Sequence, residues 1–120
     1  MLKTIACGQV RLENVGTTVT LAGWVHRRRD HGNLIFIDLR DREGLVQVVF
    51  NPELAPDLHA TVQSLRNEWV VKVQGQVNRR PEGTENPDLA TGEVEVAADH
   101  LVVLNESKTP PFYVNEDSEV

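Results

Sequence analysis

The chain of 120 residues contains a single cysteine, Cys7, so no disulfide can form within it. The four histidines, His26, His31, His59 and His100, show no spacing typical of zinc ligands. The sequence has no run of about 18 apolar residues, the length that could span a membrane. Its N-terminus also lacks the apolar stretch of a secretory signal. This combination is typical of a protein of the reducing cytoplasm.

No arrangement typical of catalysis is visible either. A glycine loop followed by Lys and Ser/Thr, which would bind phosphate, does not occur, and no nucleophile motif surrounds Ser64 or Ser107. Asp38 and Asp41 are the nearest approach to a carboxylate pair for hydrolysis, but their spacing places them on opposite faces of a strand. We therefore predict a binding protein with no catalytic residue, metal or cofactor of its own.

The charges are unevenly distributed along the chain. Its 12 Lys/Arg and 18 Asp/Glu give a net charge of −6, yet residues 24–80 hold nine basic and seven acidic residues. Most of the acidic residues follow residue 80. A local cationic patch on an acidic protein favours contact with a few phosphates over indiscriminate coating of a polymer. The acidic total therefore does not exclude a nucleic-acid partner.

Five segments alternate apolar and polar residues with period two, the pattern of half-buried strands. Between the third and fourth, the apolar positions Leu54, Leu58, Val62 and Leu65 follow a helical period. This order predicts an all-β fold with one helix, a five-stranded OB-fold Greek-key barrel with the helix between strands three and four. The predicted strands are 19–28, 34–40, 45–50, 69–78 and 93–104; the predicted helix is 56–66, and a short helical turn is expected at 11–14.

Phe36 gives the most direct indication of function. If Ile35 and Ile37 face the core, the pleat forces Phe36 outward, beside the arginines at 27–29. Stacking a base on an exposed ring is worth about 1–3 kcal/mol, and arginines can hold phosphates. In the alternative interpretation a loop or the helix covers Phe36, and the arginines only form ion pairs with Asp30, Asp38 or Asp41.

Gln47 and Glu95 are also predicted to face outward, on strands three and five. A carboxamide donates and accepts, so it matches uracil, whereas a carboxylate matches the two adjacent donors of guanine and an arginine the acceptors of cytosine. We therefore predict a surface that binds single-stranded nucleic acid. A general single-strand binder and a protein-interaction barrel anchored by Phe36 remain as alternatives.

Several segments carry motifs beyond the strand pattern, at 7–9, 23–30, 34–50, 65–68 and 90–96. Together they resemble the N-terminal anticodon-binding domain of bacterial-type aspartyl-tRNA synthetases, over nearly the whole chain. Gly-Trp-Val at 23–25 also occurs in related class II synthetases for lysine and asparagine. The joint Arg-Arg-Arg-Asp and Ile-Phe-Ile-Asp-Leu-Arg-Asp-Arg-Glu-Gly pattern is far more specific.

The resemblance implies that the chain splays out the anticodon GUC of tRNA(Asp). Phe36 would stack on the central uracil and Gln47 would hydrogen-bond to it, while Glu95 would accept from the first-letter guanine. Arg29, with Arg80 nearby, would contact the third-letter cytosine or adjacent phosphates. Further residues are expected to affect specificity or contact the RNA backbone: Arg27, Arg28, His31, Asn78 and Gly83.

His31 and Gly83 resemble the versions found in non-discriminating enzymes, which also aspartylate tRNA(Asn), whereas Asn78 stands where some relatives have a basic residue. The resemblance further implies an OB-fold domain over residues 1–106 and a linker over 107–120 that leads to a class II catalytic domain. A full-length relative would use ATP and Mg²⁺ and form a homodimer through that domain. The present chain is expected to be a monomer that binds tRNA without aminoacylating it.

Overall fold

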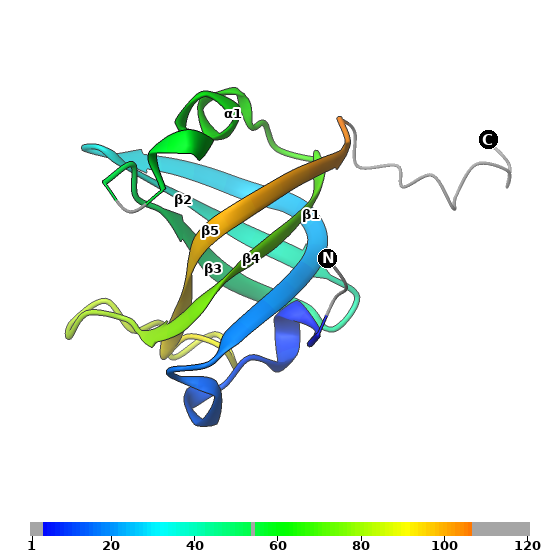
Figure 1. The fold of residues 1–120 in the computed structure, drawn as a ribbon. Helices are drawn as coiled ribbons and strands as arrows, with labels where there is room; N and C mark the ends of the chain where they lie inside the picture. Colours follow the sequence, from blue (N-terminus) through cyan, green and yellow to red (C-terminus); the bar gives the residue numbers. More distant parts are fainter. Residues whose placement is uncertain (1–3, 54, 107–120) are drawn as a thin grey trace, which may run out of the picture.

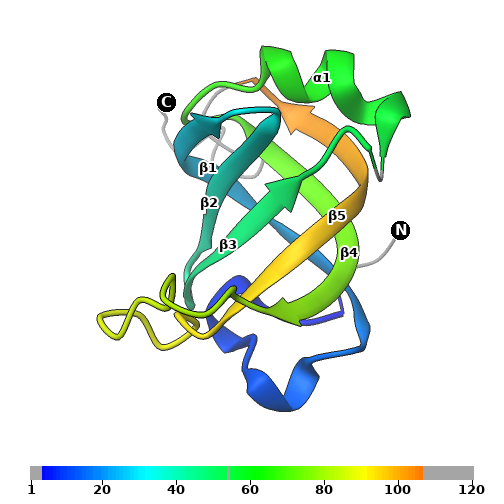
Figure 2. The same cartoon turned by 90° about the vertical axis from the view of Figure 1, so that its left-hand side faces the viewer.

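The five strands close into a barrel in the order β1-β2-β3-β5-β4 (Figures 1 and 2). The computed structural model describes residues 4–53 and 55–106, so the linker predicted at 107–120 lies outside the described residues. β3 and β5 pair in parallel, and every other pairing is antiparallel. The strands are β1 (Thr18–His31), β2 (Leu34–Asp41), β3 (Gly44–Phe50), β4 (Val70–Arg79) and β5 (Val94–Asn105).

The alternating pattern was a reliable guide because one face of every strand lines the barrel interior. Leu21, Ile37, Val48, Val73 and Val96 are all fully buried there, and their neighbours in sequence point to the outer face. Burying these side chains supplies the main driving force for closure, at about 25 cal/mol per Å² of apolar surface. The OB-fold expected from the sequence is confirmed.

A β-bulge in β1 changes which arginines face the barrel interior. The register with β2 shifts between Val25 and Arg27, so strict alternation stops at this point. Arg28 pairs with the inward-facing Ile37, while Arg29 pairs with Phe36 on the outer face. Without the bulge, alternation from Val25 would have turned Arg29 inward and away from Phe36.

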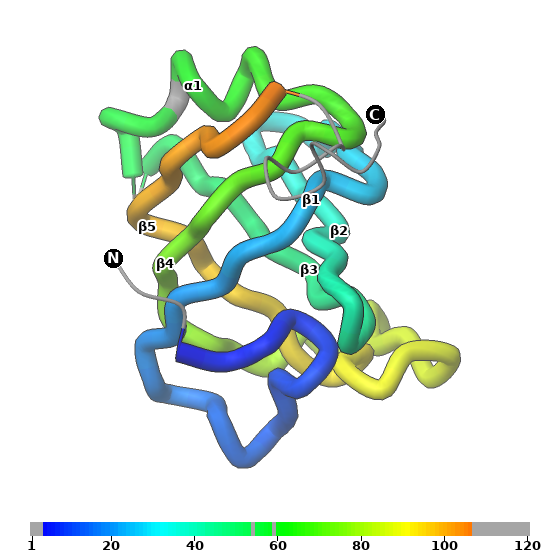
Figure 3. The backbone as a smooth tube through the Cα atoms, turned by 90° about the vertical axis from the view of Figure 1, so that its right-hand side faces the viewer, coloured from blue at the N-terminus to red at the C-terminus, as the bar shows by residue number. Residues whose placement is uncertain are grey.

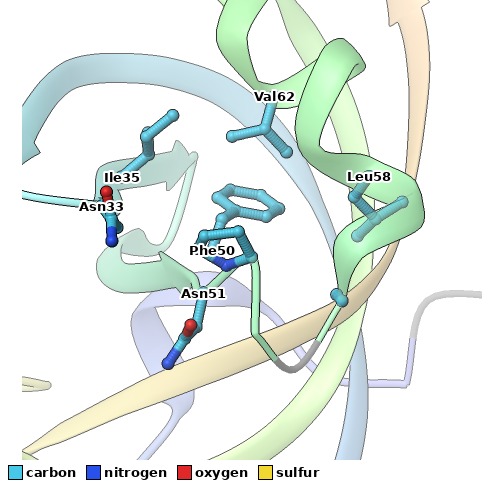
Figure 4. A pocket seen from close by; sticks show the side chains of 8 residues that line it. Asn33, Ile35, Phe50, Asn51, Leu58 and Val62 are labelled. Atoms are coloured by element: carbon cyan, nitrogen blue, oxygen red, sulfur yellow. The ribbon is translucent and has the colours of Figure 1, made fainter.

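The helix α1 (His59–Ser64) closes one end of the barrel (Figure 1). It is shorter than the predicted 56–66, because Pro56–Leu58 forms a 3-10 turn and Leu65 takes an extended conformation that ends the helix. Val62 and Leu65 are buried, so the predicted apolar face packs on the barrel. Figure 4 shows the Phe50 ring below Val62, with Leu58 and Ile35 beside it.

Arg28 joins this helix to β1. Its NH1 donates to the carbonyl oxygens of Val62 (3.2 Å), Gln63 (2.8 Å) and Leu65 (2.7 Å) at the helix C-terminus, where carbonyls run short of backbone donors. Its other nitrogens hold the Asp30 carboxylate at 2.8 and 3.0 Å. The hydrogen bond to Asp30 raises the pKa of Arg28 and lowers that of Asp30.

We expect Arg28→Ala to lower the free energy of unfolding by about 1–3 kcal/mol, because carbonyls at the end of α1 lose a charged donor. Arg27→Ala is the matched control, since Arg27 is an exposed neighbour of equal charge. Urea unfolding of both variants measures the difference. An Arg28→Ala midpoint equal to that of Arg27→Ala would show that Arg28 does not hold the helix.

The opposite end of the barrel is closed by the N-terminal segment, which holds two 3-10 turns, η1 (Cys7–Gln9) and η2 (Leu12–Asn14) (Figure 3). The second of these confirms the turn expected at 11–14. Asp41 fastens the segment to the β2–β3 turn, because its carboxylate accepts from the backbone N–H of Cys7 at 2.7 Å and of Glu43 at 2.9 Å. Cys7 itself is fully buried, and its side chain is part of the hydrophobic core.

Candidate nucleic-acid interface

A groove of about 530 Å³ runs over the outer face of the barrel. Phe36, Gln47 and Glu95 form part of its floor, on β2, β3 and β5, which face the viewer in Figure 2. His31 at the β1–β2 turn and Thr84 in the β4–β5 loop line it as well. These strands and loops are the surface on which OB-folds bind oligonucleotides.

The pairing register builds one polar row across all five strands. Arg27 on β1 lies opposite Asp38, Asp38 opposite Gln47, Gln47 opposite Glu95, and Glu95 opposite Asn78 on β4. Directly opposed side chains in a sheet lie within contact distance. Residues that are far apart in sequence thus meet in one line, with cationic, anionic and amide groups side by side.

The adjacent row holds an arginine, an aromatic ring and an apolar side chain. Arg29 lies opposite Phe36, and Phe36 opposite Val49. Phe36 is half-buried and is not part of the hydrophobic core, so the predicted outward orientation is correct. The ring lines the groove beside the polar row, with one neighbour, Arg29, carrying a guanidinium group.

Arg29 connects the two rows. Its NH2 donates to the Asp38 carboxylate at 3.0 Å and to Oε1 of Gln47 at 2.9 Å. Its Nε and NH1 make no hydrogen bond to the described part of the chain, and the side chain is 44% exposed. One edge of the guanidinium therefore orients the site, while the other remains able to bind a phosphate or a base.

Gln47 and Glu95 form the centre of the polar row. Nε2 of Gln47 donates to Glu95 at 2.9 Å. Gln47 lies on the outer face as predicted, but it is only 7% exposed, which the strand pattern did not predict. Burial raises the pKa of Glu95, and the hydrogen bond from Gln47 and the charge of Arg80 oppose that rise.

Arg80 is buried, although the sequence led us to expect a side chain that reaches RNA. Its Nε donates to the carbonyl of Val94 at 3.1 Å and its NH1 to that of Thr84 at 3.3 Å. Burial lowers the pKa of Arg80, while the Glu95 and Asp38 carboxylates act in the opposite direction. The side chain thus holds the β4–β5 loop against β5 and places a positive charge behind Glu95.

The structure brings together five of the residues singled out in the sequence: Arg29, Phe36, Gln47, Glu95 and His31 line the groove. The other five lie around it: Arg27 and Asn78 end the polar row, Arg28 faces α1, Arg80 lies beneath the loop, and Gly83 forms the loop turn. Gly83 has a φ of +90°, a conformation that favours glycine. Sequence reasoning did not single out Pro81 and Thr84, because nothing in the loop sequence indicates that they line a groove together with Gln47.

The groups in the groove suit contacts to unpaired bases. Among residues 4–53 and 55–106, no three His, Cys, Asp or Glu side chains gather closely enough to hold a metal ion. No helix in the same residues is long and apolar enough to cross a membrane. An aromatic ring, an amide, a carboxylate and a partly free guanidinium in one groove offer stacking and hydrogen bonds to unpaired bases.

Comparisons with known proteins agree with this geometry. The model of the OB-fold nucleic acid binding domain family matches residues 19–104. The aspartate–tRNA(Asp/Asn) ligase of Dehalococcoides mccartyi is 61% identical over 120 residues, which cover the whole chain and 20% of that protein. The ligase of the same name from Rubrobacter xylanophilus is 56% identical over 118 residues. The chain spans about a fifth of the length of these relatives.

Solved structures show the same barrel. Asparaginyl-tRNA synthetase from Pyrococcus horikoshii matches with a TM-score of 0.75 and 28% identity, over 92% of this chain and 25% of that one. An OBody bound to hen egg-white lysozyme matches with a TM-score of 0.76 and 29% identity, over 89% of this chain and 97% of that one. Since that OBody binds a protein, the fold alone does not decide the partner, and the groove residues must.

Proposed function

The chain belongs to the family of OB-fold nucleic acid binding domains, and its resemblance to the anticodon-binding domain of aspartyl-tRNA synthetases is confirmed; from this premise we propose that the groove binds the anticodon loop GUC of tRNA(Asp). Phe36 stacks on the central uracil and Gln47 hydrogen-bonds to it. Glu95 accepts from the first-letter guanine, and the free edge of Arg29 contacts the third-letter cytosine or its phosphate.

The observation that carries this proposal is the position of the Phe36 ring, outside the core and beside the carboxamide and carboxylate of the polar row. A ring binds any base by its face, whereas an amide and a carboxylate distinguish bases by their donors and acceptors. The juxtaposition supports recognition of a particular short sequence. A general single-strand binder needs only the ring and the cations.

The full-length protein is proposed to be an aspartate–tRNA ligase of translation in the cytoplasm, with ATP, Mg²⁺ and dimerisation belonging to a catalytic domain outside this chain. The present chain binds tRNA without catalysing the reaction. His31 lies at the groove rim, where it can contact the third letter, the only letter that differs between the anticodons of tRNA(Asp) and tRNA(Asn). With Gly83, it supports acceptance of GUU as well.

The proposal is tested by measuring the affinity of the chain for RNA hairpins with GUC, GUU or an unrelated loop, and for a poly-pyrimidine strand. We expect GUC to bind at least tenfold more tightly than the unrelated loop, because several base contacts of about 1–3 kcal/mol are lost. Affinity should fall linearly with the logarithm of salt concentration, as phosphate contacts require. Equal binding of all RNAs would indicate a general binder, and a flat salt dependence a protein-binding groove.

The raised pKa of Glu95 predicts a pH dependence. Because the pKa lies above the usual value, the carboxylate takes up a proton earlier than an exposed glutamate as the pH falls. It then no longer accepts both guanine donors, so affinity for GUC should be full above the raised pKa and decrease through it.

Titrating binding from pH 8 to pH 4, and comparing the wild type with Glu95→Gln, isolates the glutamate. The variant keeps every other titratable group, so the difference between the two curves reports Glu95 alone. We expect the acid-side loss of affinity to disappear in Glu95→Gln. Parallel curves for the two proteins would exclude Glu95 as the guanine acceptor.

A further inference from the structure

The carboxamide of Gln47 has its direction set by its neighbours. Its Oε1 accepts from Arg29 at 2.9 Å, and its Nε2 donates to Glu95 at 2.9 Å. A guanidinium can only donate and an ionised carboxylate can only accept. The reverse orientation of the amide would bring two donors together at one end and two acceptors at the other, so the flanking charges hold it in one direction.

This direction determines what the amide can offer a base. One lone pair on Oε1 and one N–H on Nε2 remain available, an acceptor beside a donor. Uracil presents its N3–H beside a carbonyl, whereas cytosine presents a bare N3 beside an amino group. The two pyrimidines therefore have opposite orders of donor and acceptor. For a base held in one orientation on the Phe36 ring, the amide direction selects between them.

Asp38 is the group that holds the Arg29 end of this arrangement. Its carboxylate is 15% exposed and lies 3.0 Å from NH2 of Arg29, directly opposite Gln47 in the register. Asp38 is not among the residues that line the groove, unlike Glu95, and its negative charge opposes the binding of phosphate. Its position beside both Arg29 and Gln47 suits a role in orienting them.

We propose that Asp38 is a positioning residue, which fixes Arg29 and through it the direction of the Gln47 carboxamide, so that the groove prefers uracil to cytosine at the base on Phe36. The inference rests on the proposed function and adds to it the origin of the preference at the middle letter. The preference is carried by the chain of hydrogen bonds from Asp38 to Glu95, rather than by Gln47 alone.

The test compares the dissociation constants for hairpins that differ only in the middle letter, GUC and GCC. Wild type should prefer GUC. Asp38→Ala should reduce the ratio of the two constants roughly tenfold, the value of one well-placed hydrogen bond. Asp38→Asn should restore most of the ratio, because its amide oxygen can still accept from Arg29. Restoration by the isosteric amide would not be expected if charge alone mattered.

Asp30→Ala is the matched control. Asp30 also lines the groove, and its replacement removes the same charge and takes a carboxylate from an arginine, Arg28. It lies outside the chain of hydrogen bonds that ends at Glu95. The affinity of the variant for both hairpins should change by the same factor, so that its ratio equals that of the wild type. Thermal melting verifies that each variant is folded, and Asp38→Ser replaces Asp38→Ala if the alanine variant is not.

The outcomes separate this inference from the proposed function. A wild type that prefers GUC, with an unchanged ratio in Asp38→Ala, would overturn the role of Asp38 and leave the proposed function standing. Equal binding of GUC and GCC by a wild type that still requires Phe36 would overturn the selection by amide direction. A wild type that binds neither hairpin better than an unrelated loop would overturn the proposed function itself.

Discussion

Phe36→Ala is expected to weaken binding of the GUC hairpin by about 5- to 150-fold, the equivalent of the 1–3 kcal/mol that a base gains by stacking on an aromatic ring. The ring lies outside the core, so we expect the melting temperature of the variant to stay within about 5 °C of the wild type. Fluorescence anisotropy with a labelled hairpin, combined with thermal melting, measures both quantities.

Phe36→Leu distinguishes stacking from simple apolar contact. Leucine retains apolar surface in the groove but has no π-face, so it should bind almost as weakly as the alanine variant. Phe36→Tyr retains the ring and should bind nearly as well as the wild type. Leucine binding as tight as phenylalanine would show that the groove accommodates an apolar group of a partner and does not stack a base.

Arg80→Ala is expected to have the largest effect on stability, with a loss of about 2–4 kcal/mol in the free energy of unfolding. The side chain is 8% exposed, and its removal leaves the carbonyls of Val94 and Thr84 without a charged donor. It also leaves Glu95 without the positive charge that opposes the rise of its pKa. Both effects arise from uncompensated polar groups in a poorly solvated region.

Arg79→Ala serves as the control for Arg80→Ala, because Arg79 is its exposed neighbour with the same charge. Chemical unfolding should separate the two variants clearly, with Arg79→Ala close to the wild type. Arg80→Lys keeps the charge behind Glu95 but has no planar fork, so it should recover only part of the loss. Equal unfolding midpoints for Arg79→Ala and Arg80→Ala would contradict the assignment of Arg80 to the loop.

The sequence predicted the barrel well because one physical rule, the alternation of inward and outward side chains, holds over most of each strand. Ile35, Ile37 and Leu39 are buried as the period required, and the outward position of Phe36 follows from the same rule. The end of the helix was harder to predict, because the extended conformation of Leu65 depends on the packing of α1 on the barrel.

Features that depend on contacts between distant residues could not be predicted in this way. The bulge before Arg27 changes the face of Arg28 and Arg29, yet it leaves no mark in the local pattern of polar residues. The burial of Gln47 and Arg80 depends on how the β4–β5 loop lies, and its polar sequence indicates only a loop. The polar row depends on the pairing register between strands, which the alternation within each single strand does not predict.

The most direct test of the central claim is an NMR titration of the chain with the GUC hairpin. If the anticodon lies in the groove, nuclear Overhauser contacts should join the uracil ring protons to the Phe36 ring. The largest shift changes should then fall on Arg29, Phe36, Gln47 and Glu95. The absence of any contact to Phe36, with shift changes confined to the exposed apolar end of β5 at Val102 and Leu104, would contradict it.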